Sequence, residues 1–334
     1  MKRKYSETVN LSVPGGLAGQ IFAVGYGAWI SKNLRLPVHI NFYDVGSDIS
    51  QFGVEALVLS QTAKDLGISY SQIMGNLNWA SSASSPFTMW AEERAEHIRT
   101  WAHERANPRA WDRIRTVYRA ISSKEWDAEG RPSRVKTGVI TLETLQSVTS
   151  GEHLVGYPTD YRVIEEAWQS LSAMIQESQL PNFARDTGKE ESLAIHWRLG
   201  DYVNNNTHGS IDWSAFENCL TKITGEETPI KIFTDSPALA KKLVGSSLSG
   251  RQVTYISRDI WSDLFEMTRS KTFIASNSGV SILAAIALRS DNSNSWTWLP
   301  DRWFVDARFN DEFARPEATF NGSSVYTVKF DSEV

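Results

Sequence analysis

Short runs of β-branched and apolar residues alternate, along most of the chain, with longer segments in which apolar residues recur at helical spacing. The first unit of this pattern is a strand over Val9–Val13, a glycine-rich turn over Pro14–Gln20, a helix over Ile21–Leu34 and a second strand over Pro37–Phe42. A strand, a helix and a second strand in this order build parallel sheets. The chain is therefore predicted to open with a parallel sheet whose first strand ends at the glycines.

The alternation becomes regular in the second half of the chain. The expected strands span Leu193–Trp197, Ile230–Thr234, Val253–Ile256, Thr272–Ala275 and Trp296–Leu299. The expected helices between them span Trp213–Ile223, Pro237–Leu243, Ile260–Ser270 and Val280–Leu288. Short strands interleaved with helices are typical of a doubly wound parallel sheet, which binds ligands beyond the carboxyl ends of its strands. We therefore predict an α/β fold and look for chemistry directly after each strand.

A segment with helical periodicity and mixed charge, Pro86–Ile121, lies between these two regions. Arginines and glutamates three and four residues apart usually form a solvated helix face, and a surface for an acceptor or a partner is the alternative. A strand over Gly151–Tyr157 and a helix over Tyr161–Glu177 follow, and Leu180–Lys189 has the composition of a linker. We therefore expect the domain boundary in this linker.

Length and composition agree with two domains and exclude several classes of protein. A chain of 334 residues is about twice the usual domain size, so we expect domains at 1–185 and 186–334. The net charge of -5 argues against a nucleic-acid partner. Cys219 is the single cysteine, so neither an internal disulfide nor a conventional zinc site is expected. No secretory or membrane-spanning segment is visible, and we expect a cytoplasmic protein.

Charged and polar residues follow three of the predicted strands. Arg198 and Asp201 come after the first of them, Asp235 after the second, and Ser278 and Gly279 open the helix after the fourth. The unpaired amides and the dipole at a helix start attract anions. An arginine offers a matching fork of donors to a phosphate. Arg198 and this helix start predict a phosphate site at the carboxyl edge of the second sheet.

Other nucleotide motifs are missing, and each short motif has a structural alternative. The chain has no Walker-type loop and no spaced G-x-G-x-x-G, so neither ATP hydrolysis nor a nicotinamide cofactor is supported. Taken singly, His196 and Arg198 could be a strand end with a salt bridge, Asn277 a helix cap, and Gly15 with Gly16 only a turn. Their order and spacing along the chain favour the functional interpretation over these structural ones.

Short blocks occur in a fixed order from residue 15 to about 288. They read GGLAGQIF at 15–22, HWRLGDY at 196–202, FTD at 233–235 and NSGVS at 277–281, with GY at 156–157 and DL at 263–264 between them. The set resembles the alpha-1,2-fucosyltransferase family, whose pattern is GGLGNQ, then HxRRGDY, then a strand ending in F-S/T-D, then N-S-T-F-S. The shared order carries the resemblance, because each block alone is short.

The resemblance implies a GT-B type glycosyltransferase with two Rossmann-like domains facing a cleft. Residues 1–185 would be the acceptor-side domain with a helical insertion, and residues 186–334 the nucleotide-sugar-binding domain. The implied reaction is inverting, needs neither metal nor cofactor, and transfers fucose from GDP-fucose to a hydroxyl of a glycan or a glycosylated small molecule. A related transferase that uses another deoxy sugar, a heptose or another nucleotide is one alternative. A catalytically inactive binding protein for nucleotide sugars or glycans is the other.

The resemblance also implies roles for individual residues. Arg198, with the amides of Ser278 and Gly279, would receive the charge that develops on the leaving β-phosphate. His196 would orient that arginine or contact the nucleotide, and Asp235 would lie near the base or ribose. The full donor-binding set is Gly15, Gly16, His196, Arg198, Asp235, Asn277, Ser278 and Gly279.

Inversion also requires a base for the acceptor hydroxyl. Asp201 is the candidate within the motif, and His208 and Asp212 on the next loop are alternatives. The chain departs from the family pattern at two positions, because Leu199 replaces the second arginine and Gly19 replaces the asparagine. These departures affect the inference about fucose more than the inference about the diphosphate.

Overall fold

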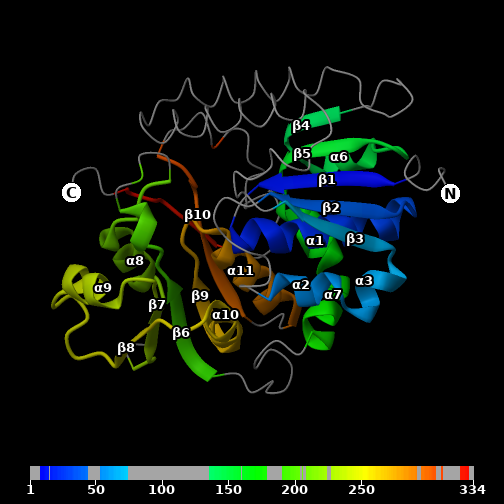
Figure 1. The fold of residues 1–334 in the computed structure, drawn as a ribbon. Coiled ribbons are helices and arrows are strands. Elements are labelled where there is room, and N and C mark those ends of the chain that lie inside the picture. Colours follow the sequence, from blue (N-terminus) through cyan, green and yellow to red (C-terminus); the bar gives the residue numbers. More distant parts are fainter. Residues whose placement is uncertain are drawn as a thin grey trace. The chain divides into compact units, whose positions relative to one another are not determined.

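The computed structural model describes residues 8–14, 16–43, 53–73, 135–158, 160–178, 190–203, 205, 208–223, 227–291, 295–305, 310 and 324–330. The chain divides into two compact units, residues 1–160 and 161–334. Each unit contains one parallel sheet with helices, which confirms the predicted α/β class (Figure 1). None of the helices in the described ranges combines the length and the apolar character needed to cross a membrane.

The sheet of the first unit has the strand order β3-β2-β1-β5-β4, and every neighbouring pair is parallel. Its strands are β1 (Val9–Pro14), β2 (Val38–Tyr43), β3 (Ile68–Ile73), β4 (Val135–Val139) and β5 (His153–Tyr157). Its described helices are α1 (Leu17–Leu34), α2 (Val54–Val58), α3 (Gln61–Asp65) and α6 (Leu142–Gln146). The first strand of the chain therefore lies in the middle of the sheet.

Alternation along the strands separates an apolar face from a polar one. Leu11 and Ile40 are buried on the face that α1 covers, whereas their neighbours Asn10 and His39 belong to the opposite face. A β-carbon on Gly27 of α1 would lie only 3.2 Å from Cδ1 of Ile40, so this glycine allows the close approach of helix and sheet.

Helix α1 begins at Leu17, four residues earlier than the sequence pattern suggests. The expected turn over Pro14–Gln20 is therefore wrong in its second half, and Gly19 lies in the first helical turn. Gly16 is the N-cap residue, and it makes no side-chain capping bond. Buried residues, most of them apolar, lie around almost the whole circumference of this helix. Their burial outweighs the low helix propensity of its glycines.

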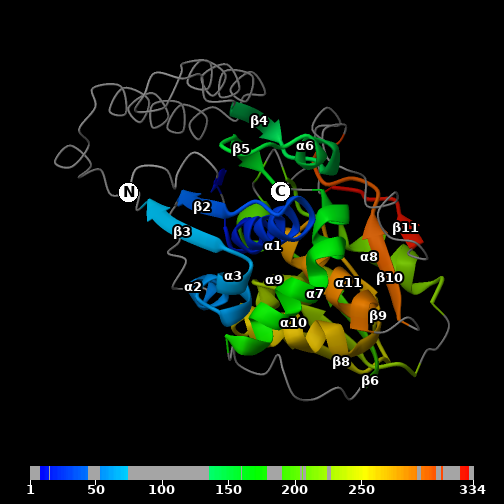
Figure 2. The same cartoon turned by 90° about the vertical axis from the view of Figure 1, so that its right-hand side faces the viewer.

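The second unit has the strand order β11-β10-β9-β6-β7-β8, and its neighbouring strands are also parallel. Its strands are β6 (Glu190–His196), β7 (Ile230–Phe233), β8 (Val253–Ile256), β9 (Ser270–Ile274), β10 (Trp296–Pro300) and β11 (Ser324–Tyr326). Its helices are α7 (Tyr161–Glu177), the short 3-10 helix η2 (Gly200–Tyr202), α8 (Trp213–Leu220), α9 (Pro237–Val244), α10 (Ile260–Arg269) and α11 (Gly279–Asp291). Helices α10 and α11 pack together, against β9 and β10 respectively (Figure 2).

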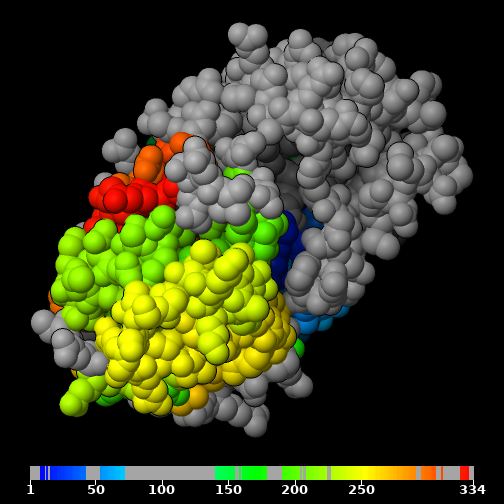
Figure 3. Space-filling model, turned by 90° about the vertical axis from the view of Figure 1, so that its left-hand side faces the viewer, coloured from blue at the N-terminus to red at the C-terminus, as the bar shows by residue number. Residues whose placement is uncertain are grey.

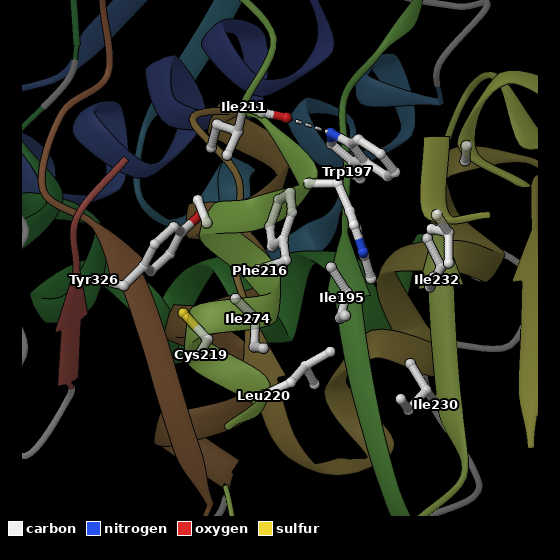
Figure 4. Packing of buried hydrophobic residues seen from close by; sticks show 14 of the residues in the cluster. Ile195, Trp197, Ile211, Phe216, Cys219, Leu220, Ile230, Ile232, Ile274 and Tyr326 are labelled. Atoms are coloured by element: carbon white, nitrogen blue, oxygen red, sulfur yellow. Dashed lines mark hydrogen bonds between the residues drawn. The ribbon is translucent and has the colours of Figure 1, made fainter. Parts of the chain in front are cut away.

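The other face of this sheet holds a large hydrophobic cluster. Ile195 of β6 and Trp197 directly after it pack with Phe216 and Cys219 of α8 (Figure 4). The indole Nε1 of Trp197 donates to the carbonyl of Ile211 at 2.9 Å, so the only polar atom of this buried side chain is satisfied. Figure 3 views the second unit from the side that carries α8 and α9, coloured yellow-green to yellow, with β11 in red.

Most strands and helices of the second unit agree with the sequence pattern within a few residues. Helix α7 matches its expected bounds, and it packs against α11 within the second unit. The division between the units lies before α7, whereas the boundary expected between 185 and 186 falls in a segment outside the described residues. The mixed-charge segment Pro86–Ile121 also lies outside them. Strands β3, β4 and β11 were not expected from the sequence.

Candidate functional site

The carboxyl ends of β9, β6 and β7 lie side by side at one edge of the second sheet, in that order. Ile195 of β6 pairs with Ile274 of β9, and His196 pairs with Phe233 of β7. The segments that leave these ends carry Arg198, Asp235 and the start of α11. The structure therefore brings the sequence-predicted residues of the second unit to a common edge, as a doubly wound sheet requires.

Arg198 is held between two carboxylates. Its Nη1 lies 2.9 Å from Oδ2 of Asp235, and its Nε donates to Oδ1 of Asp201 at 2.9 Å. Its Nη2 lies 2.8 Å from the same Asp201 oxygen. The side chain of Asp201 is 63% exposed, whereas that of Asp235 is 26% exposed. Because exposed carboxylates move at little cost, Asp201 is the looser of the two partners.

Asp235 also fixes the turn after β6. Its Oδ1 accepts hydrogen bonds from the backbone amides of Leu199 at 3.0 Å and Gly200 at 2.9 Å. A β-carbon at Gly200 would lie 2.6 Å from Oδ2 of Asp235, so only glycine fits there without moving the carboxylate. One carboxylate therefore holds both the guanidinium and the backbone that carries it.

This arrangement leaves Arg198 able to bind an anion. Its three contacts with Asp201 and Asp235 use at most three of the five guanidinium N–H groups. Because two carboxylates already pair with the guanidinium, an incoming phosphate competes with the exposed Asp201 for it. The guanidinium engages the β7 side of β6, whereas α11 follows β9 on the other side. Their convergence on one diphosphate stays a prediction.

His196 is buried among hydroxyl groups at the end of β6. Its Nδ1 lies 2.6 Å from Oγ of Ser281 and 3.4 Å from Oγ of Ser276. Burial, with the nearby Arg198 charge, lowers the pKa of His196 to about 4, so the ring is neutral at pH 7. The contact between Ser281 and His196 ties the first turn of α11 to β6. Oγ of Ser281 also accepts from the amide of Ser276 at 3.0 Å, which fixes the loop between β9 and α11.

Asn277 is directed at protein backbone. Its Nδ2 donates to the carbonyls of His208 at 2.8 Å, Gly209 at 3.1 Å and Trp303 at 3.1 Å. Its side chain is buried, and its Oδ1 has no hydrogen-bond partner among the described residues. Asn277 therefore holds two loops against the start of α11. Its Nδ2 hydrogen bonds are made with the protein backbone, and its predicted contact with the donor stays a prediction.

An aromatic cluster adjoins Arg198. The rings of Tyr202 and His208 stack with centroids 5.0 Å apart, and His208 also lies 5.0 Å from the ring of Phe304. The Arg198 guanidinium carbon lies 5.7 Å from the centre of the Tyr202 ring. Sequence reasoning missed Phe304, because its partner His208 is far away in the chain and such a pairing leaves no local signal. Tyr202 was visible only as the last residue of the HWRLGDY block.

Ser278 and Gly279 form the start of α11, a helix of 13 residues. Ser278 is buried, and its carbonyl accepts the first backbone bond of the helix, from Ile282 at 3.2 Å. Gly16, in contrast, belongs to the first unit, where it is exposed and a β-carbon added to it would meet no atom within 4 Å. Gly15 lies outside the described residues. The approach of these two glycines to a donor stays a prediction.

The two departures from the family pattern have different surroundings. Leu199 is fully buried in the hydrophobic cluster beneath the site, where an arginine side chain would be costly. Gly19 lies in the first turn of α1, in the other unit. The described ranges hold no group of three or more His, Cys, Asp or Glu side chains placed to bind a metal ion.

No protein-family model and no curated protein matches the chain. Among solved structures, E. coli heptosyltransferase WaaC with ADP has a TM-score of 0.41 at 10% identity, covering 96% of this chain and 93% of its own. The glycosyl transferase family 9 protein from Veillonella parvula has a TM-score of 0.41 at 11% identity, covering 96% and 86%. NodZ alpha-1,6-fucosyltransferase soaked with GDP-fucose has a TM-score of 0.40 at 11% identity, covering 85% of this chain and 93% of its own. Such values assign neither family nor substrate.

Proposed function

We propose that the protein is a glycosyltransferase that transfers a sugar from a nucleotide sugar to a hydroxyl of a glycan or a glycosylated small molecule. The observation that carries the proposal is the placement of Arg198 and the start of α11 at neighbouring strand ends of one parallel sheet. Phosphates are bound at such an edge by helix amides and by arginine forks. The order of the sequence blocks, which resembles the alpha-1,2-fucosyltransferases, supports the same function.

The chemistry requires stabilisation of a leaving nucleoside diphosphate. Negative charge develops on the β-phosphate as the bond to the sugar breaks, and preorganised donors lower the barrier. We assign this role to Arg198 together with the amides of Ser278 and Gly279, which removes the need for a divalent metal. Asp235 then acts as the group that aims the arginine. A GT-B type fold belongs to this proposal.

For the donor we propose GDP-fucose, with inversion at the anomeric carbon. The resemblance supports this choice. The two departures from the family pattern, Leu199 and Gly19, weaken the assignment of fucose more than that of GDP. A transferase for another deoxy sugar or a heptose uses the same Arg198 and helix start. Gly15 and Gly16 stay in the proposed donor-binding set because of the resemblance.

The donor is tested with a thermal-shift panel of GDP, UDP, dTDP, ADP and CMP, followed by assays of nucleoside diphosphate release. A ligand at a hundred times its dissociation constant adds about 2.7 kcal/mol of stability. We expect GDP to give the largest shift and GDP-fucose to release GDP when an acceptor is present. A preference for another nucleotide would remove fucose but keep the transferase, and no stabilisation by any nucleotide would remove the proposal.

Arg198→Ala tests the role of the guanidinium. We expect at least a hundredfold loss of transfer and weaker binding of the nucleoside diphosphate, by comparison with the loss of one oxyanion donor. Arg269→Ala is the matched control. Arg269 also pairs with a carboxylate, Glu190 at 3.4 Å, but at the amino ends of β6 and β9, away from the proposed site. Full turnover in Arg198→Ala would contradict the assignment.

A catalytically inactive nucleotide-sugar or glycan binding protein is the second candidate. The neutralisation of Arg198 by Asp201 and Asp235, and the burial of Leu199, favour it. Such a protein would be stabilised by a nucleotide or a glycan yet would release no nucleoside diphosphate from any donor. The release assay therefore separates the two candidates.

A further inference from the structure

The sequence gives three candidates for the side chain that accepts a proton from an acceptor hydroxyl. Asp212 is the N-cap of α8, where its Oδ1 accepts from the amide of Ser214 at 2.6 Å. Asp201 directs Oδ1 at Nε and Nη2 of Arg198. Both carboxylates therefore have a defined partner within the protein. His208 is the third side chain.

Among the described residues, the imidazole of His208 is positioned by ring stacking. Neither ring nitrogen has a hydrogen-bond partner among the described residues, although the ring is half-buried and packs on Tyr202 and Phe304. Its backbone is held at both ends, because its amide donates to Oδ1 of Asn205 at 3.0 Å and its carbonyl accepts from Asn277 at 2.8 Å. The ring contacts its neighbours by stacking, and its nitrogens accept a proton in the ring plane.

The charges around this ring favour the form that can accept a proton. Burial lowers the pKa of His208 below its usual 6.5, while the Asp201 carboxylate opposes that shift. Tyr202 beside it stays neutral, since burial raises the pKa of its phenol to about 12. The Arg198 guanidinium carbon lies 5.7 Å from the centre of the tyrosine ring. The imidazole is therefore neutral at pH 7, and Asp201 stabilises the imidazolium once it forms.

We propose that His208 is the base that deprotonates the acceptor hydroxyl, and that Asn277 is the positioning residue that holds its loop against the start of α11. The assignment rests on the proposed transferase function. The sequence left Asp201, His208 and Asp212 as candidates for this role, and the geometry favours His208 over the two carboxylates.

The proposed step is balanced as follows. The acceptor oxygen forms a bond to the anomeric carbon of the donor sugar while the bond from that carbon to the β-phosphate oxygen breaks. The electron pair of the broken bond leaves with the nucleoside diphosphate, which Arg198 receives. The hydroxyl proton passes to a ring nitrogen of His208 and then to solvent, so the neutral imidazole is restored.

His208→Gln tests the base, with His208→Ala as a second variant. We expect a hundredfold or greater loss of kcat, the usual contribution of a positioned base, and loss of the acidic limb of kcat/KM that wild type shows below pH 6.5. Nucleoside diphosphate binding, measured by thermal shift, should be retained, which shows that the variants are folded. His39→Gln is the matched control, because burial also lowers the pKa of His39, in the first unit.

Asn277→Ala tests the positioning role. We expect a lower kcat with the acidic limb still present, and no additional loss when the change is combined with His208→Gln, because both act on one group. A merely structural role would give additive losses.

The outcomes separate this inference from the function on which it rests. Wild-type protein that releases no nucleoside diphosphate from any donor would remove both. Active wild type with an unchanged acidic limb in His208→Gln would overturn only the base, and a lost limb in Asp201→Asn would return the role to Asp201.

Discussion

Gly200 and Asp235 are matched in shape, because a β-carbon on Gly200 would lie 2.6 Å from the carboxylate oxygen that pairs with Arg198. Gly200→Ala should therefore displace the Asp235 carboxylate and destabilise the protein by about 1–3 kcal/mol, the usual cost of overpacking. In an Asp235→Ala background the same change should cost much less. Urea unfolding of the two single variants and the double variant measures this coupling, and additive costs would show that the two residues are independent.

Asp201 should compete with a nucleoside diphosphate for Arg198. Asp201→Asn removes a negative charge beside the guanidinium, and exposed ion pairs are worth up to about 1 kcal/mol, so affinity should rise by up to about fivefold. Calorimetric titration with GDP measures it. Glu191→Gln is the control, because Glu191 is also exposed and pairs with Lys271 near the amino ends of β6 and β9. Weaker binding in Asp201→Asn would contradict competition.

Burial of neutral His196 should make stability depend on pH. Its pKa is about 4 in the folded protein and about 6.5 in the unfolded chain, so between these values only the unfolded chain binds the proton. The free energy of unfolding should therefore fall by about 3 kcal/mol from this residue as pH drops from 6.5 to 4. Urea titrations across this range should give a smaller slope for His196→Gln than for wild type. Equal slopes would show that His196 does not carry the effect.

Cys219 should not react in the folded protein. The thiol is fully buried in the cluster beneath β6, and burial raises its pKa to about 12, so almost no thiolate is present at pH 8. Labelling with a disulfide reagent should proceed only in denaturant. Stoichiometric labelling of native protein within minutes would mean that α8 opens readily.

The hydrophobic pattern predicted five of the six strands of the second sheet, all except β11. Strand β8 occupies its expected residues, and α7 and α9 begin where their patterns begin. The alternation of apolar positions at a period of two or of about 3.6 residues depends only on neighbours in the chain. The early start of α1 was not predicted, because glycines at its amino end resemble a turn unless the helix is known to be buried.

The sequence alone also determined which residues follow the strands, and hence that Arg198, Asp235 and Ser278 lie at a common edge. Only the tertiary structure decided what each side chain contacts there. It paired Arg198 with Asp201 and Asp235, turned Asn277 toward the loops of His208 and Trp303, and left the His208 ring nitrogens without a described partner. Strand ends are specified by local patterns, whereas most of these contacts join residues far apart in the chain, and packing selects among them only once the chain has folded.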